Sequence, residues 1–326
     1  MGNRAFVFPG QGVQRVGMGA DVAEHSPAAK NVYAMADAVL GMEMTALSFT
    51  GPVEALTETR NAQPAIFTAS VACLAAYVEA CGAEALSDLP DALQPSLVAG
   101  HSIGEFTALV AAGAISFEDG LRLVQTRSQL MQRAVEDAPG GMAAVIGVSP
   151  QVVLQLCARA RGADSRSTVS IATFNTPQQV VIAGDTAGLS RAIALLKEHG
   201  ARRIVPLRVG GAFHTQLMAS VQAEWSAAVE AAPLAQPHIP IVANATANIV
   251  TSVEALRHEL IVQMTSPVRW AATLDILLRR NLDPILEFGP GAVLTRMIGS
   301  IATAEAAVAI DSPQAVRQAA AAGTVA

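Results

Sequence analysis

Short apolar runs alternate with longer amphipathic stretches along most of the chain. The runs Ala5–Phe8 and Ser96–Ala99 are bounded by proline or glycine, which predicts short buried strands. The stretches 20–47, 63–80 and 121–135 place apolar residues at helical spacing, which predicts helices. Alternation of strands with helices is typical of an α/β fold with a parallel sheet.

The segment 139–208 has a pattern of its own. Its predicted strands and helices follow in the order βαββαβ, which is typical of a ferredoxin-like unit. The α/β pattern then resumes, with strands predicted at Ile239–Val242 and Pro284–Phe288. We therefore expect a discontinuous large α/β domain, formed by 1–138 and 209–326, with a small ferredoxin-like domain, 139–208, inserted into it.

Composition and charge exclude several classes of protein. The 326 residues are 52% hydrophobic and 15% charged, which suits a large buried core. A net charge of −6 without a basic run argues against nucleic acid as a partner. The three cysteines form no metal-binding cluster, so we expect no metal site or disulfide framework but small buried side chains at Cys73, Cys81 and Cys157. The alanine-rich tail after Pro313 is expected to be a frayed end.

The N-terminus lacks the layout of a signal peptide, and no uncharged apolar run reaches the length of about 18 residues that a membrane span needs. We therefore expect a cytoplasmic protein that does not enter a membrane.

The pentapeptide Gly100-His101-Ser102-Ile103-Gly104 joins a predicted strand to a predicted helix. A strand, a sharp turn with a serine and a helix form the context of a nucleophile elbow, so we expect an α/β-hydrolase-like large domain. Ser102 would carry an acyl group as an ester, and the backbone N–H of Ile103 would face the developing oxyanion. The alternative is a tight turn whose glycines serve packing alone.

A serine nucleophile needs a base, and the chain has six histidines. His214 is favoured because it lies in a glycine-containing loop after the inserted segment. His101 adjoins the serine and is expected to point away from it and orient the turn. Between Ser102 and His214 no acidic residue stands out at a strand end, which indicates a dyad with a neutral group orienting the histidine. Spacing alone leaves the role of His214 open. The remaining histidines carry no signal of function: His25, His199, His238 and His258.

Arg127 falls among the apolar positions of the helix predicted at 121–135. A guanidinium on a core-facing stripe is costly unless it is paired, so Arg127 is a candidate binding residue. The alternative is an arginine tied to a structural carboxylate.

Taken in order, the motifs of this chain resemble those of the malonyl-CoA:acyl carrier protein transacylases and of the acyltransferase domains of polyketide synthases. The resemblance extends over nearly the whole chain, and several independent motifs in the right order are more specific than any one of them. The matching segments are Phe8–Gly12, Gln63–Ala65, Gly100–Glu105, Arg127, Asn175–Gly184, Phe213–His214, Ser266–Trp270 and Glu287–Gly291.

The resemblance implies a role for each candidate residue. Ser102 takes the acyl group, and His214 acts as general base and then as general acid. The backbone carbonyl at Gln263 holds the histidine, which agrees with the missing acidic residue. The backbone N–H of Gln11 completes the oxyanion hole with that of Ile103. Supporting positions in the site are Gln63, His101, Asn175 and Phe213.

The resemblance also implies the substrates. Arg127 would bind the free carboxylate of a malonyl group, and Phe213 would disfavour the extra methyl of methylmalonyl. Malonyl-CoA would be the donor, and the phosphopantetheine thiol of an acyl carrier protein the acceptor. Coenzyme A enters as a substrate thioester, so no metal or bound cofactor is expected, and the protein is expected to be a monomer.

Two other classes of function stay open at this point. A thioesterase or esterase would use water in place of the carrier thiol, whereas a docking or scaffold subunit would keep the fold without the chemistry. The motifs do not separate fatty acid synthesis from polyketide synthesis or malonate decarboxylation, and they do not locate the surface that the carrier protein contacts.

Overall fold

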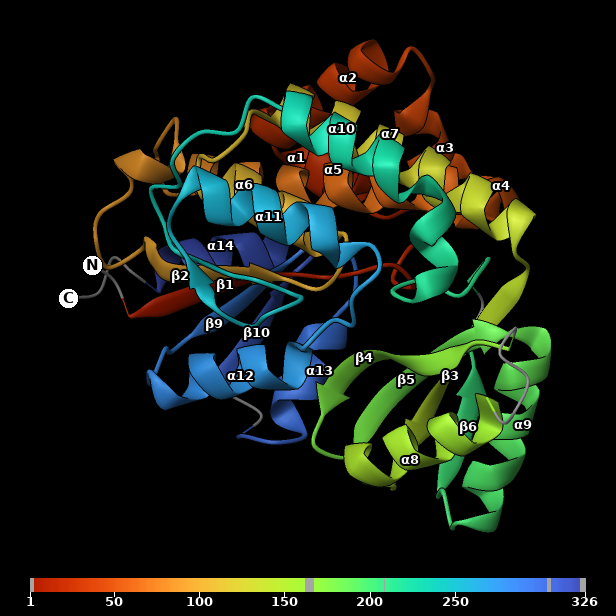
Figure 1. Cartoon of the computed structure of the whole chain (residues 1–326). Helices are drawn as coiled ribbons and strands as arrows, with labels where there is room; N and C mark the ends of the chain where they lie inside the picture. The colour runs from red at the N-terminus through yellow and green to blue at the C-terminus, as the bar shows by residue number, and fades with distance from the viewer. Residues whose placement is uncertain (1–2, 162–166, 208, 304–305, 323–326) are drawn as a thin grey trace.

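The structure is a computed structural model that describes residues 3–161, 167–207, 209–303 and 306–322. Within these ranges the strands form two sheets, one of six strands and one of four. Figure 1 shows the larger sheet inside a large helical body and the smaller sheet beside it, with helices of its own.

The six-stranded sheet has the order β10-β9-β1-β2-β7-β8, and all neighbouring pairs are parallel except β7 and β8. Parallel strands of this kind are buried on both faces by helices. The strands are β1 (Arg4–Phe8), β2 (Pro95–Gly100), β7 (Ile241–Val242), β8 (Ile249–Val250), β9 (Ile285–Phe288) and β10 (Ala307–Ile310).

Helices cover both faces of this sheet (Figure 1). One face is covered by α12 (Trp270–Arg279) and α13 (Val293–Gly299). On the other side, α5 (Thr59–Ala80), α6 (Gly104–Ala111) and α14 (Pro313–Ala321) lie directly on the strands. The remaining helices on that side are α1 (Ala20–His25), α2 (Pro27–Leu40), α3 (Met44–Thr50), α4 (Val53–Thr57), α7 (Phe117–Asp137), α10 (Gln222–Ala231) and α11 (Val253–Gln263). Short 3₁₀ helices lie at Leu86–Asp88 and Gln216–Val221.

Strand β1 shows how the sequence divides between the two faces. Phe6 and Phe8 belong to the larger core beneath α5, α6 and α7, whereas Ala5 and Val7 belong to the core formed with α12 and α13. Because side chains of a strand alternate, this short apolar run contributes to both cores at once.

The second sheet has the order β4-β5-β3-β6 and is antiparallel. Helices α8 (Pro150–Arg161) and α9 (Thr186–Glu198) cover one of its faces, which gives the predicted order βαββαβ. The predicted α/β fold class is therefore confirmed. The strands are β3 (Gly140–Ile146), β4 (Val169–Thr176), β5 (Gln179–Asp185) and β6 (Arg203–Pro206).

Strand β4 also joins the small sheet to the large body. Phe174 donates its backbone N–H to the carbonyl of Val268 at 2.8 Å, and Val268 donates to the carbonyl of Ala172 at 2.9 Å. The small sheet is thus held beside the large one by backbone hydrogen bonds as well as by the chain that connects them.

Three expectations need correction. The tail after Pro313 is not frayed over its first turns, because Ser312 caps α14 and Val316 is buried against the large core. The helical stretch 20–47 is divided, since α1 ends at His25 before Pro27, and α2 ends where Gly41 adopts a φ of 62°. Cys81 is only partly buried, unlike Cys73 and Cys157.

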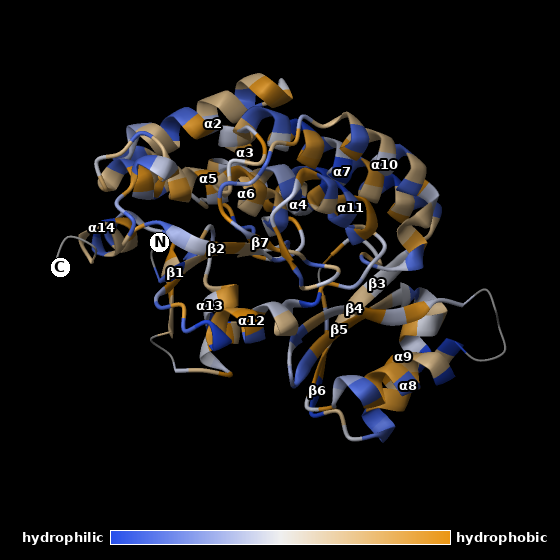
Figure 2. Ribbon diagram, turned by 60° about the vertical axis from the view of Figure 1, so that its left-hand side comes forward, coloured by the Kyte–Doolittle hydropathy of each residue, from blue (hydrophilic) through white to orange (hydrophobic). Residues whose placement is uncertain are grey.

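The helices carry hydrophobic and hydrophilic residues together, whereas β1 and β5 are largely hydrophobic (Figure 2). In the part of the chain that the structure describes, no helix has both the length and the apolar character needed to cross a membrane.

Candidate active site

The candidate site lies where several parallel strands end. Gln11 follows β1, Ser102 follows β2 and Asn244 follows β7, and these three strands are neighbours in the sheet. The carboxyl ends of parallel strands meet at one edge, which is where α/β folds place their sites. The pocket at this edge is closed on its other side by the open face of the small sheet.

The turn that carries Ser102 is tightly packed and strained. A Cβ atom at Gly100 would lie 2.0 Å from the backbone of Gly104, and one at Gly104 would lie 2.1 Å from the carbonyl oxygen of Phe8. Ser102 itself has a φ of 53°, a left-handed conformation that is uncommon for a residue with a side chain. The glycines therefore do serve packing, but they also hold the serine at the end of β2.

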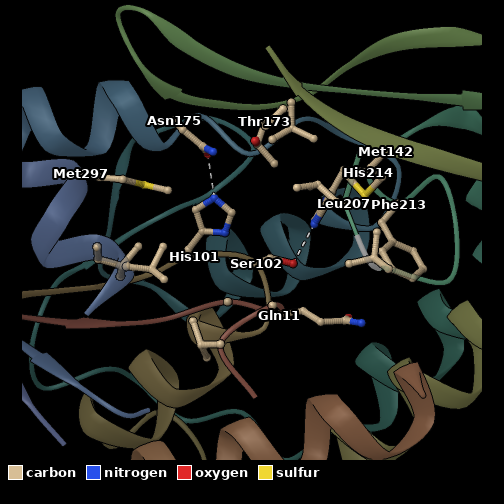
Figure 3. Close-up of a pocket in the computed structure, with 18 of the residues that line it drawn as sticks. Gln11, His101, Ser102, Met142, Thr173, Asn175, Leu207, Phe213, His214 and Met297 are labelled. Atoms are coloured by element: carbon tan, nitrogen blue, oxygen red, sulfur yellow. Dashed lines mark hydrogen bonds between the residues drawn. The ribbon is translucent and has the colours of Figure 1, made fainter. Parts of the chain in front are cut away.

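His214 lies opposite this serine. Its Nε2 is 2.7 Å from Ser102 Oγ, as the dashed line in Figure 3 marks. Its Nδ1 is 3.0 Å from the carbonyl oxygen of Gln263 and 3.1 Å from that of Ser266. Carbonyl oxygens only accept hydrogen bonds, so Nδ1 carries the proton and the bare Nε2 accepts from the serine hydroxyl.

The histidine is buried and also has a φ of 58°. Burial lowers its pKa to about 3, with a further lowering by the nearby Arg127 guanidinium. His214 is therefore neutral at physiological pH and able to take a proton. Its partners at Nδ1 are backbone carbonyls, with no carboxylate bonded there among the described residues.

Arg127 is fully buried, with 0% of its surface exposed. It donates from Nη1 to Gln63 Oε1 at 2.7 Å, and from Nη2 to Gln263 Oε1 at 2.8 Å and to Ser102 Oγ at 3.3 Å. Its Nε has no hydrogen-bond partner in the structure. A buried cation with neutral partners beside the serine can receive a negatively charged group.

The two backbone N–H groups predicted to form the oxyanion hole are available to bind a substrate oxygen. Within the described ranges, the backbone N–H groups of Gln11 and Ile103 donate no hydrogen bond. The side chain of Gln11 instead contacts Thr59 and Gln63, each at 3.4 Å. Gln63 thereby links the loop after β1 to the guanidinium of Arg127.

His101 points away from Ser102 and toward the small sheet (Figure 3). Its Nε2 lies 3.0 Å from Asn175 Oδ1, and its ring packs edge-on against Trp270 at 5.6 Å. Burial lowers the pKa of His101, so the ring is neutral. The contact with Asn175 joins the serine turn to β4. None of the other histidines lines the pocket, and all of them are exposed: His25, His199, His238 and His258.

The remaining wall of the pocket is mostly apolar. It includes Phe213, which is buried beside His214, and Thr173, whose hydroxyl has no partner in the structure. Further lining side chains are Ala144 and Val181. Met142, Leu207 and Met297 also line the pocket and are labelled in Figure 3. Among the described residues, no group of His, Cys, Asp or Glu side chains is placed to hold a metal ion.

Sequence reasoning missed Asn244, which fixes the serine turn. Its Oδ1 accepts from the backbone N–H of Ser102 at 2.7 Å, and its Nδ2 donates to the carbonyl of Gly100 at 2.7 Å. Its own backbone N–H donates to Glu105 Oε1 at 2.9 Å. The only sequence signal for Asn244 is that a polar residue lies two positions after the end of a predicted strand.

Comparison with known proteins agrees with this geometry. The profile of the acyl transferase domain matches residues 5–324. A malonyl CoA-acyl carrier protein transacylase of Bacillus subtilis (strain 168) is 35% identical over 316 residues, covering 97% of this chain and 96% of that protein. The protein of the same name from Escherichia coli (strain K12) is 37% identical over 312 residues, covering 96% of this chain and 97% of the relative.

A solved structure is also similar to this chain over nearly its whole length. It contains a holo acyl-carrier protein of a type II polyketide synthase in complex with its malonyl-transacylase, and it superposes with a TM-score of 0.90 at 37% identity. The match covers 98% of this chain and 99% of that one. The chain thus belongs to the acyl transferase family.

Proposed function

We propose that this protein moves a malonyl group from malonyl-CoA to the phosphopantetheine thiol of an acyl carrier protein. The observation that carries the proposal is the buried guanidinium of Arg127, which lies 3.3 Å from Ser102 Oγ and has only neutral hydrogen-bond partners. The names of the relatives, which are malonyl transacylases, support the same substrates.

The first half-reaction loads the serine. His214 Nε2 takes the hydroxyl proton while Ser102 Oγ attacks the thioester carbonyl, and the backbone N–H groups of Gln11 and Ile103 stabilise the oxyanion. The intermediate expels the thiolate of coenzyme A, which receives the proton from His214. The product is a malonyl ester on Ser102.

The second half-reaction unloads it. His214 takes the proton of the carrier thiol, the sulfur attacks the ester carbonyl, and Ser102 Oγ leaves and regains its proton. The substrate thioester and the side chains supply all the chemistry, so the proposal needs no resident metal or cofactor. One chain holds the whole site, which supports an active monomer, and we expect the reaction to take place in the cytoplasm.

Arg127 selects the acyl group in this mechanism. A malonyl carboxylate can pair with the guanidinium, whereas an acetyl group leaves a buried cation without a counter-charge. Loss of one partner of a buried charge pair costs on the order of 2–5 kcal/mol, which is enough to separate the two donors.

The test is to expose the protein to malonyl-CoA and follow Ser102 by mass spectrometry. We expect a malonyl ester that holo acyl carrier protein discharges and water does not. The Ser102→Ala variant should form no ester and lose transfer by a factor of about 10³ or more. Rapid release of free malonate would identify a hydrolase instead, and malonyl transfer by Ser102→Ala would exclude the serine ester.

A further inference from the structure

The side chain of Gln263 contacts more of the site than its backbone does. Its Oε1 accepts from Arg127 Nη2 at 2.8 Å, and its Nε2 donates to the carbonyl oxygen of Ser102 at 3.1 Å. Nε2 also donates to Glu105 Oε2 at 2.5 Å. One amide thus lies between the arginine, the serine turn and a buried carboxyl group.

Glu105 lies in the first turn of α6, directly after the serine turn, and is only 1% exposed. Both of its oxygens are used, because Oε1 accepts from the backbone N–H of Asn244 at 2.9 Å and Oε2 accepts from Gln263 Nε2. The mechanism above assigns it no step. A buried carboxyl group is costly, so its presence next to the site needs a reason.

The orientation of the Gln263 amide provides that reason. An amide can face either way, and its neighbours decide which end is the donor. Glu105 Oε2 and the carbonyl of Ser102 are both acceptors, so the NH₂ group must face them. The amide oxygen is then left to face Arg127.

On the basis of the proposed function, we propose that Glu105 is a positioning residue for the acyl carboxylate. Glu105 accepts a hydrogen bond from Gln263 Nε2 and so fixes the orientation of the amide. In that orientation Gln263 Oε1 accepts from Arg127 Nη2 and holds the guanidinium in place. The guanidinium is held by neutral groups, and its charge stays available to the substrate. A carboxylate bonded directly to Arg127 would compete with the malonyl group for the same fork.

The electrostatics agree with this arrangement. Burial lowers the pKa of Arg127 to about 10, and the nearby Glu105 opposes that shift. Burial above all, and then the neighbouring Glu259, raise the pKa of Glu105 well above its usual range, although the hydrogen bonds from Gln263 and Asn244 and the charge of Arg127 oppose this shift. Both oxygens of Glu105 accept hydrogen bonds, which favour its ionised form, and in that form it raises the pKa of Arg127 from one amide away.

The test is the isosteric variant Glu105→Gln. The new amide must keep its oxygen toward the N–H of Asn244, so its NH₂ faces the NH₂ of Gln263. Gln263 can relieve that clash only by turning over, which directs its own NH₂ at Arg127. We expect kcat/KM for malonyl loading of Ser102 to fall about tenfold more than that for acetyl loading.

Glu259→Gln is the matched control. Glu259, on α11, is a second buried carboxyl group beside the same loop, where it accepts from the backbone N–H of Ala245 at 2.6 Å, and it has no hydrogen bond to Gln263. Its substitution should change malonyl and acetyl loading by the same factor. Equal losses in Glu105→Gln would show that Glu105 has a structural role only.

Two further variants keep the proposal testable. In an Arg127→Ala background, Glu105→Gln should have little further effect on malonyl loading, because the residue that it positions is gone. If Glu105→Gln does not fold, Gln263→Met removes the same amide and should also lower the malonyl-to-acetyl ratio; an unchanged ratio would overturn the proposal. Absence of malonyl transfer by the unaltered protein would instead refute the proposed function.

Discussion

Two walls of different character face each other across the pocket (Figure 3). The wall at the carboxyl edge of the large sheet carries the polar groups, with Ser102 and His214 both at positive φ and the buried charge of Arg127 behind them. The wall formed by the open face of the small sheet is regular and mostly apolar. Its hydroxyl at Thr173 has no hydrogen-bond partner among the described residues, and Asn175 is joined to His101.

This difference suggests that the wall of the large sheet carries out the chemistry, whereas the wall of the small sheet sets the shape of the pocket. Strained backbone and buried charge lower the stability of a protein, and they persist where surrounding contacts hold them for a function. At the large sheet those contacts are amides, from Gln63, Asn244 and Gln263. The small sheet has a polar network around Asp185, but Asp185 does not line the pocket. Substitutions on the pocket-facing side of this sheet should therefore alter fit more than reactivity.

Among substitutions at the wall formed by the large sheet, Arg127→Ala should reduce malonyl loading most, apart from substitution of Ser102 itself. Malonyl loading should fall by at least about 30-fold, which corresponds to the lower end of the cost of a broken buried charge pair. Acetyl loading should be spared or improved, because it no longer leaves a buried charge unpaired. Rates of ester formation with each acyl-CoA would measure both.

The control for this variant is Arg133→Ala on the same helix. Arg133 is exposed and paired with Glu224, so its loss should leave both rates close to those of the unaltered protein. An equal loss of malonyl and acetyl loading in Arg127→Ala would contradict a selective role for the arginine.

The pH profile of acetyl loading tests the coupling between Arg127 and His214. The pKa of His214 is lowered to about 3, so the base is neutral above that pH and loading should show no inflection near the ordinary histidine value of about 6.5. Without Arg127 its repulsion is gone, and the pKa of His214 should rise.

The acid limb of Arg127→Ala should therefore move to higher pH, so that its rate near pH 5 falls relative to its rate near pH 8. Acetyl-CoA is the donor of choice here, since its acyl group has no carboxyl that titrates. Superimposable profiles for the two proteins would show that the guanidinium does not act on the base.

Local pattern was enough to predict the parts of the site that depend on one segment. Ser102 follows a strand and precedes a helix, and Arg127 interrupts an apolar stripe, so each is visible within a few residues of sequence. The dyad could be inferred only indirectly, from the lack of an acidic residue and from the family resemblance.

The supporting contacts could not be predicted in the same way. The hydrogen bond between the N–H of Ser102 and Asn244 joins residues 142 positions apart, and that between Gln263 and Glu105 joins residues 158 apart. Such partners meet only because β2, β7 and α11 pack together. The prediction of a frayed tail was wrong for a related reason. The alanine-rich helix α14 is held in place by its contact with α5, which local sequence does not show.

Phe213 lines the pocket beside His214, and Phe213→Ser tests whether its ring sets the fit of the acyl group. Removing the ring opens space beside His214, so methylmalonyl loading should rise relative to malonyl loading by roughly tenfold, within the value of about 1–3 kcal/mol for one methyl group. Competition between the two acyl-CoA donors would measure the ratio.

Leu207→Ala is the control for Phe213→Ser, because it enlarges the same pocket from the side of the small sheet. It should leave the methylmalonyl-to-malonyl ratio nearly unchanged. A similar gain in both variants would show that pocket volume, not the ring beside the histidine, sets the preference.

The smallest effect is expected on the second wall, from Thr173→Val. Valine replaces a buried hydroxyl that has no hydrogen-bond partner in the part of the chain that the structure describes, so the free energy of unfolding should rise by up to about 1 kcal/mol while malonyl loading changes little. Thr176→Val, on the same strand, removes a hydroxyl that accepts from the N–H of Gln178 at 3.3 Å and should instead destabilise the protein. Denaturant unfolding of both variants measures the contrast. A marked loss of loading in Thr173→Val, with stability unchanged, would show that this hydroxyl binds the substrate and that the second wall does more than shape the pocket.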